Sequence, residues 1–267
     1  MRMAIHGVPR SGTTWMGSLF NSSGSIQYFN QPLFSYAFKG RLNNKSSKTE
    51  VLEFFKDVSE SKDEFINQSL QKSEGSIPVF DKMDILGVAY KEARYHHLIP
   101  HLLSTDDELF MFLIIRNPLG VLASWLNAPK EFDSQTMDFL EEWRNAPKKN
   151  EGRIEEYYGF NKWKEFALMA HRIQEEYPER CMIIAYSELL EETELRVKDC
   201  FSFCGVPFRD QTKEFIIHSR SRDMSEDAYS VFRVKSEDKE WKTILPQSVI
   251  DEVHKDLMGT ELEIYLQ

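Results

Sequence analysis

The chain has 267 residues, 41% of them hydrophobic and 13% aromatic, which suits a folded enzyme with one large α/β domain. Its formal net charge of −10 argues against a broad surface for nucleic acid or for an anionic membrane. Because an apolar strand is predicted at the N-terminus, we expect no signal peptide, and no apolar run approaches the length of a transmembrane segment. We therefore expect a cytoplasmic protein that concentrates its cations locally wherever it binds a polyanion.

The first motif begins with an apolar run, Met3–Ile5, which predicts a buried strand. A loop marked by glycine and proline follows from Gly7 to Gly12, and a helix is expected from Thr13. The backbone N–H groups of such a loop and the dipole of the following helix favour an anion, so this unit predicts a phosphate site. The glycine spacing is that of a Walker A loop, but Thr13 stands where that motif has lysine, and the cation lies inside the loop at Arg10. Ordinary nucleoside triphosphate chemistry is therefore disfavoured.

Apolar patterns predict four elements between the first motif and the second: strands at 26–29 and 77–80, and helices at 49–72 and 87–104. Thr49 is the expected N-cap of the first of these helices. The strand at 77–80 would end at the edge of the site and deliver Lys82 and Asp84 there. A partly desolvated carboxylate at Asp84 could accept a proton from a hydroxyl group, and Asp81 is a second candidate.

The second motif is an apolar run of seven residues, Leu109–Ile115, which is typical of a central parallel strand buried on both faces. Arg116 follows at the carboxyl end of this strand, and Pro118 is well placed to start a helix that carries Ser124. The arginine fork and the hydroxyl group can converge on one phosphate.

The remaining third of the sequence predicts helices near 135–145 and 160–176, a buried strand at 181–186, a helix to Phe203 and a final helix at 248–258. His97 and His101, like Cys200 and Cys204, are one helical turn apart, but each pair lacks further ligands at suitable spacing. We therefore expect no metal site.

Both motifs resemble those of the sulfotransferases that use 3′-phosphoadenosine 5′-phosphosulfate (PAPS). The first, V-P-R-S-G-T-T-W, resembles the 5′-phosphosulfate loop, and the second, I-R-N-P-x-x-V-x-A-S, resembles the 3′-phosphate motif. The likeness is greatest to the carbohydrate and tyrosylprotein branches, without their signal or membrane anchor. It implies an α/β fold of the P-loop type, with a three-layer arrangement of about four or five parallel strands and helices on both faces. A single domain would span 1–267, with acceptor-side helical insertions at about 34–75 and 128–176.

The resemblance also implies roles for individual residues. The 5′-phosphate would be bound by Arg10, Ser11, Gly12, Thr13 and Thr14. Trp15 would stack on adenine, and Tyr186 would border it. The 3′-phosphate would be bound by Arg116 and Ser124, together with Arg233 from a C-terminal closing loop.

For catalysis, the resemblance implies that Arg10 and Lys82 stabilise the charge that develops in the transfer. The related branches have a glutamate as base at the position of Gln31, and a carboxamide cannot take a proton. We therefore expect Asp84 to be the base in metal-free transfer from PAPS to a hydroxyl group of a glycan, lipid or small molecule, leaving 3′-phosphoadenosine 5′-phosphate (PAP). Two alternatives stay open: a P-loop phosphotransferase that uses ATP and Mg²⁺, and a non-catalytic nucleotide-binding protein, which Gln31 would suit.

Overall fold

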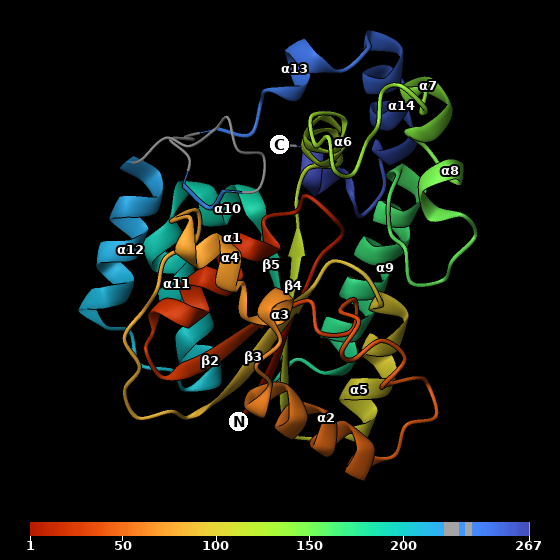
Figure 1. The fold of residues 1–267 in the computed structure, drawn as a ribbon. Helices are drawn as coiled ribbons and strands as arrows, with labels where there is room; N and C mark the ends of the chain where they lie inside the picture. The colour runs from red at the N-terminus through yellow and green to blue at the C-terminus, as the bar shows by residue number, and fades with distance from the viewer. Residues whose placement is uncertain (222–229, 233–236, 267) are drawn as a thin grey trace.

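A five-stranded parallel sheet runs through the centre of the molecule (Figure 1). The computed structural model describes residues 1–221, 230–232 and 237–266. The strand order is β2-β3-β1-β4-β5. The strands are β1 (Arg2–His6), β2 (Ile26–Asn30), β3 (Gly87–Glu92), β4 (Leu109–Ile115) and β5 (Cys181–Ala185). This confirms the predicted α/β class with a parallel sheet.

The sheet is central because its strands are apolar on both faces. In β1, Ala4 packs into the core on one side, while Met3 and Ile5 pack into the core on the other. The alternation continues in β4, where the side chain of Leu113 joins the first core and that of Phe112 joins the second. Burial on both faces is the arrangement that an uninterrupted apolar strand favours.

Helices cover both faces of the sheet, as predicted. The first core is closed by α2 (Lys48–Glu60), α5 (Ile99–Thr105), α6 (Pro118–Leu126), α9 (Phe160–Glu176) and α14 (Gln247–Leu257). The second is closed by α1 (Thr13–Ser22), α10 (Tyr186–Glu191), α11 (Thr193–Cys204) and α12 (Asp210–Ser221). In Figure 1, α11 and α12 lie to the left of the sheet, and α5 and α9 lie to its right. Short helices connect these elements: α3 (Glu64–Asn67), α4 (Ser69–Ser73), η1 (His96–Leu98), α7 (Phe139–Glu142), α8 (Pro147–Asn150), α13 (Trp241–Ile244) and η2 (Glu263–Leu266).

Two of the predicted elements are wrong in type. The stretch 77–80 is not a strand, and the first part of the expected helix at 87–104 is instead β3. The pattern misled because β3 is short and ends in two charged residues, Lys91 and Glu92, which fit the polar face of a helix. In the fold both side chains are buried at the end of the strand. Only η1 and α5 retain the helical character that was expected there.

The expected helix at 49–72 is divided into α2, α3 and α4. Ser47, and not Thr49, caps α2: its side chain accepts from the N–H of Glu50, and the Glu50 carboxylate accepts from the N–H of Ser47. Such a reciprocal capping box fixes the start of a helix more strongly than a threonine without that partner. In the region expected to be helical at 135–145, α7 spans one turn.

Candidate active site

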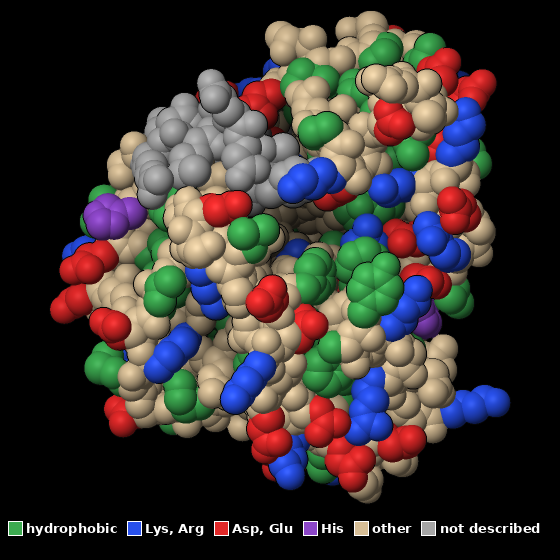
Figure 2. Space-filling view, viewed as in Figure 1, with side chains coloured by type: hydrophobic (Ala, Val, Ile, Leu, Met, Phe, Trp, Pro, Cys, Tyr) green, Lys and Arg blue, Asp and Glu red, His purple; other side chains and the backbone are tan. Residues whose placement is uncertain are grey.

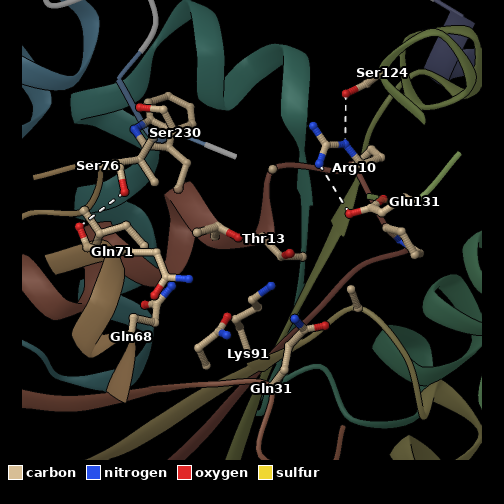
Figure 3. A pocket seen from close by; sticks show the side chains of 18 of the residues that line it. Arg10, Thr13, Gln31, Gln68, Gln71, Ser76, Lys91, Ser124, Glu131 and Ser230 are labelled. Atoms are coloured by element: carbon tan, nitrogen blue, oxygen red, sulfur yellow. Dashed lines mark hydrogen bonds and ion pairs between the residues drawn. The ribbon is translucent and has the colours of Figure 1, made fainter. Parts of the chain in front are cut away.

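A pocket of about 590 Å³ opens where the strands end. Its volume lies in the range usual for small-molecule sites, which is roughly 300–1,000 Å³. Figure 2 shows this hollow on the viewed face, with basic side chains around it. In Figure 3, Lys91 and Gln31 lie along one side of the pocket, Arg10, Ser124 and Glu131 lie on the right, and Gln68, Gln71, Ser76 and Ser230 lie on the left.

The loop between β1 and α1 forms the base of the pocket. Gly12 has φ +90°, and a Cβ atom there would lie 2.6 Å from the Tyr186 ring. A Cβ atom on Gly7 would lie 2.8 Å from the backbone oxygen of Ile114. Both positions therefore require glycine, which lets the loop fold tightly against β4 and Tyr186. The N-terminus of α1 has no side-chain cap, so its N–H groups face a position suited to an anion.

Ser11, in the loop, differs from Thr13 and Thr14, at the start of α1, in its access to this position. Thr13 and Thr14 line the pocket, as the sequence leads one to expect. Ser11 is completely buried, and its hydroxyl group has no hydrogen-bond partner among the residues that the structure describes. A buried, unpaired hydroxyl group is uncommon and favours a ligand or a small adjustment of the loop.

Arg10, Arg116 and Ser124 come together although two separate motifs supply them. The Arg10 Nε donates to Ser124 Oγ at 3.1 Å. The Arg116 Nη1 donates to the backbone oxygen of Arg10 at 2.7 Å. The two motifs therefore lie in direct contact at the ends of β1 and β4.

The guanidinium of Arg116 is held by a carboxylate that the sequence analysis did not single out. Asp238 Oδ2 accepts from Arg116 Nε and Asp238 Oδ1 accepts from Nη2, each at 2.6 Å. The two side chains are only 8% and 6% exposed. Burial opposes the charged form, but attraction to Asp238 outweighs it and raises the pKa of Arg116. Gly120, in the first turn of α6, makes room, since a Cβ atom there would lie 2.5 Å from Asp238 Oδ2.

An aromatic corner lies beside these arginines. The Trp15 and Tyr186 rings meet edge to face with centroids 6.4 Å apart, and both residues line the pocket. The Trp15 Nε1 donates to Ser219 Oγ at 3.2 Å, which ties the indole to α12. The Arg116 guanidinium lies 4.9 Å from the centroid of the Tyr186 ring. An aromatic surface formed by Trp15 and Tyr186 thus adjoins the two arginines.

The end of β3 contributes a lysine that the sequence analysis missed. Lys91 lines the pocket and is 5% exposed, and burial lowers the pKa of its ammonium group. Gln31, after β2, is held there by Arg94, whose Nη1 donates to Gln31 Oε1 at 3.3 Å. The same arginine donates to Glu156 at 2.8 Å and to the Tyr158 hydroxyl group at 3.0 Å. The signal that could have found Lys91 is its place directly after the apolar run at 88–90, a run that fits a short strand as well as the expected helix.

Lys82 and Asp84 do not lie in the pocket, so their expected place at the edge of the site is wrong. The Lys82 Nζ donates to the backbone oxygens of Asn21 and Ile26 at 3.0 and 2.6 Å, near the end of α1 and the start of β2. These contacts lie where β2 begins, whereas the pocket opens at the ends where the strands finish. The Asp84 side chain is 84% exposed and lies 3.6 Å from Arg209. Asp81 is also exposed on this segment. The physical reason is that 77–86 precedes the strand rather than following one.

Glu131 is the carboxylate closest to the loop arginine in the described pocket wall. Its Oε1 lies 3.5 Å from Arg10 Nη1. Its Oε2 is buried and has no hydrogen-bond partner within the described part of the chain. It belongs to the segment after α6, within the acceptor-side insertion expected at about 128–176, where no motif singles it out.

Three further expectations concern Arg233, a metal site and a membrane-spanning helix. Arg233 lies outside the described residues. Within the described ranges, no group of three or more His, Cys, Asp or Glu side chains could hold a metal ion. A search of the same ranges found no helix with the length and apolar character needed to cross a membrane.

Comparison with known proteins identifies the family. Residues 2–260 match the family model described as a sulfotransferase domain. The mouse sulfotransferase SULT7A1, solved in complex with PAP, is similar with a TM-score of 0.57 at 15% identity, over 99% of this chain and 87% of that one. The sulfotransferase domain of the olefin synthase from Synechococcus PCC 7002 has a TM-score of 0.53 at 12% identity, over 97% and 95%. At these identities the two structures establish the fold. A comparison with curated protein sequences found no match.

Proposed function

This chain belongs to the sulfotransferase domain family, and we propose that it transfers the sulfuryl group of PAPS to a hydroxyl group. The observation that supports PAPS most directly is the Asp238 carboxylate on the Arg116 fork. It marks an anion site beside the N-terminus of α6, separate from the phosphate loop at α1. PAPS carries anionic groups at both its 3′ and 5′ ends, whereas ATP has no phosphate on its 3′ oxygen. The mouse protein with the same fold was solved in complex with PAP.

The residues of the pocket suit the parts of this donor. The loop from Gly7 to Gly12 and the threonines that follow it would bind the 5′-phosphate, and Arg116 with Ser124 would bind the 3′-phosphate. The aromatic corner of Trp15 and Tyr186 would hold the adenine.

Bound PAPS supplies an activated sulfuryl group whose leaving group is a phosphate. Arg10 and Lys91 would stabilise the negative charge that grows on the transferring oxygens, so Lys91 takes the role first assigned to Lys82. A preorganised donor in such a site is typically worth ~3–4 kcal/mol of barrier.

The acceptor side of the pocket combines apolar rings and amides. Phe34 and Phe65 lie at its wall with ring centroids 6.0 Å apart, and each is about two-fifths exposed. Gln68 and Gln71 line the same wall. Exposed rings beside carboxamides suit an acceptor that has an apolar surface and hydroxyl groups. We propose a small-molecule, lipid or glycan acceptor of that kind.

Calorimetric titration of the wild-type protein with PAP, with adenosine 5′-phosphate and with ATP plus Mg²⁺ tests the choice of donor. We expect PAP to bind most tightly, because it alone carries the 3′-phosphate. Arg116→Ala should weaken PAP binding by roughly tenfold or more, given about 1.5–3 kcal/mol for hydrogen bonds to a charged group. Arg41→Ala, at an exposed arginine that pairs with Asp57, is the matched control. A preference for ATP with Mg²⁺, or indifference to the 3′-phosphate, would overturn the proposal.

A further inference from the structure

Transfer to a neutral hydroxyl group needs a group that takes its proton, and the expected candidates do not provide one. Gln31 is a carboxamide, which cannot take the proton, and its Oε1 already accepts a hydrogen bond from Arg94 Nη1. Asp84 lies outside the pocket, on a segment that contacts the backbone just before β2 begins. Histidine does not occur among the described residues that line the pocket. The carboxylates that line the pocket in the described chain are Glu74 and Glu131.

Of these two carboxylates, Glu131 is the one beside the phosphate loop. Glu74 lies exposed after α4. The Glu131 side chain is 20% exposed, and its Oε1 approaches the guanidinium of Arg10 at 3.5 Å. Arg10 also contacts Ser124, so the Arg10 side chain connects Glu131 to both proposed anion sites (Figure 3). A proton acceptor for this reaction needs to be near the atoms being transferred.

Glu131 also keeps hydrogen-bonding capacity that neighbouring carboxylates have used. Asp238 is occupied by two hydrogen bonds of 2.6 Å to Arg116. Glu156 accepts from Arg94 at 2.8 Å. By contrast, the contact between Glu131 and Arg10 is long and involves one oxygen, and Glu131 Oε2 has no partner in the described chain. A carboxylate that is held so loosely can accept a proton without losing a strong ion pair.

We propose that Glu131 is the catalytic base, an inference that rests on the proposed sulfuryl transfer. The acceptor oxygen forms a bond to sulfur while the bond between sulfur and the 5′-phosphate oxygen breaks, and that bonding pair leaves on the phosphate. The hydroxyl proton passes to the Glu131 carboxylate and then to water. Glu131 lies on the segment that follows α6, so the helix that carries Ser124 leads directly to the base.

The test compares Glu131→Gln with the wild type on two acceptors, 2-naphthol and 4-nitrophenol, at a pH where only the second is ionised. Release of inorganic sulfate from radiolabelled PAPS measures transfer to water in parallel. We expect the variant to lose about 10²–10⁴-fold in rate with 2-naphthol and with water. Transfer to 4-nitrophenolate should change little, because this acceptor has no proton to remove.

Calorimetry with PAP separates the base role from a structural one. Because Glu131 is proposed to act on the acceptor, the affinity of Glu131→Gln for PAP should equal or exceed that of the wild type. Asp84→Asn, at an exposed carboxylate outside the pocket, is the control and should keep wild-type rates.

The remaining outcomes each overturn a different statement. An equal loss with both acceptors, or weaker PAP binding, would mean that Glu131 only positions Arg10. Unchanged rates with 2-naphthol and water would exclude it as the base. A wild-type protein that binds no PAP would refute the proposed function and this inference with it.

Discussion

Replacing Asp238 by alanine should tighten PAP binding. In the structure the Asp238 carboxylate occupies the Arg116 fork with two hydrogen bonds of 2.6 Å, so a 3′-phosphate must displace it. A hydrogen bond to a charged group contributes about 1.5–3 kcal/mol, and tenfold in affinity corresponds to about 1.4 kcal/mol. Removing the competing anion should therefore raise the affinity for PAP by roughly tenfold to a hundredfold.

The same change should destabilise the protein without ligand, because Arg116 is left buried and unpaired. Breaking a buried ion pair by removing one partner typically costs about 3–5 kcal/mol. Urea unfolding with and without PAP measures this cost, and calorimetry measures the affinity. Glu237→Ala removes one negative charge from the same segment at an exposed side chain that pairs with Lys239, and it should change neither quantity appreciably. If the folded Asp238→Ala protein binds PAP no more tightly than the wild type, Asp238 does not compete for the anion site.

The other predictions concern Lys91 in the pocket wall and two buried histidines. Lys91→Met should lower kcat for both 2-naphthol and 4-nitrophenolate by about 10²–10³-fold, because Lys91 stabilises charge whatever the acceptor; steady-state kinetics checks this, and a loss confined to 2-naphthol would contradict it. His6 and His96 are joined through their Nδ1 atoms at 3.0 Å. Burial lowers the pKa of His6 to about 3 and lowers that of His96 well below its usual value. The unfolded chain then binds more protons below its own pKa, so these two histidines should contribute a fall of about 2–3 kcal/mol in the free energy of unfolding from pH 7.5 to pH 5.5. Urea unfolding at the two pH values measures this, and His96→Phe should reduce the fall by about half.

The sequence predicted those parts of the site that local patterns determine. The phosphate loop is continuous in sequence, and its glycines are required by contacts of the loop itself with β4 and Tyr186. Arg116 could be placed because the seven apolar residues before it predict a buried strand that ends at this residue. Its neighbour Ser124 follows on the next helix.

Lys91 was missed because tertiary structure overrides its local pattern. A charged pair at the end of a six-residue strand resembles the polar face of a helix, and the burial that identifies it comes from distant segments. The expectation for Lys82 fails for a related reason. It rests on a strand at 77–80, whereas the strand that ends at the pocket is β3. The apolar residues at the start of 87–104 pack against the core as expected, but they follow the alternation of a strand and not the period of a helix.

Asp238 and Glu131 could not be found from the sequence at all. Asp238 is 122 residues from Arg116, and Glu131 is 121 residues from Arg10. Neither lies in a segment with a regular pattern, and an isolated acidic residue in a loop is most often solvated. Only the folded chain shows that each of them meets an arginine of the pocket.

The position of β1 has a consequence for how the chain folds. This strand comes first along the chain, yet it lies at the centre of the sheet, where Arg2 is paired with Val88 on one side and with Leu109 on the other. A chain leaving the ribosome cannot complete either ladder until those distant residues have been made. Closing such long loops before the contacts form slows folding, and the first strand meanwhile exposes its apolar faces. Because the phosphate loop directly follows this strand, nucleotide binding and the completed sheet should arise together in a single late step.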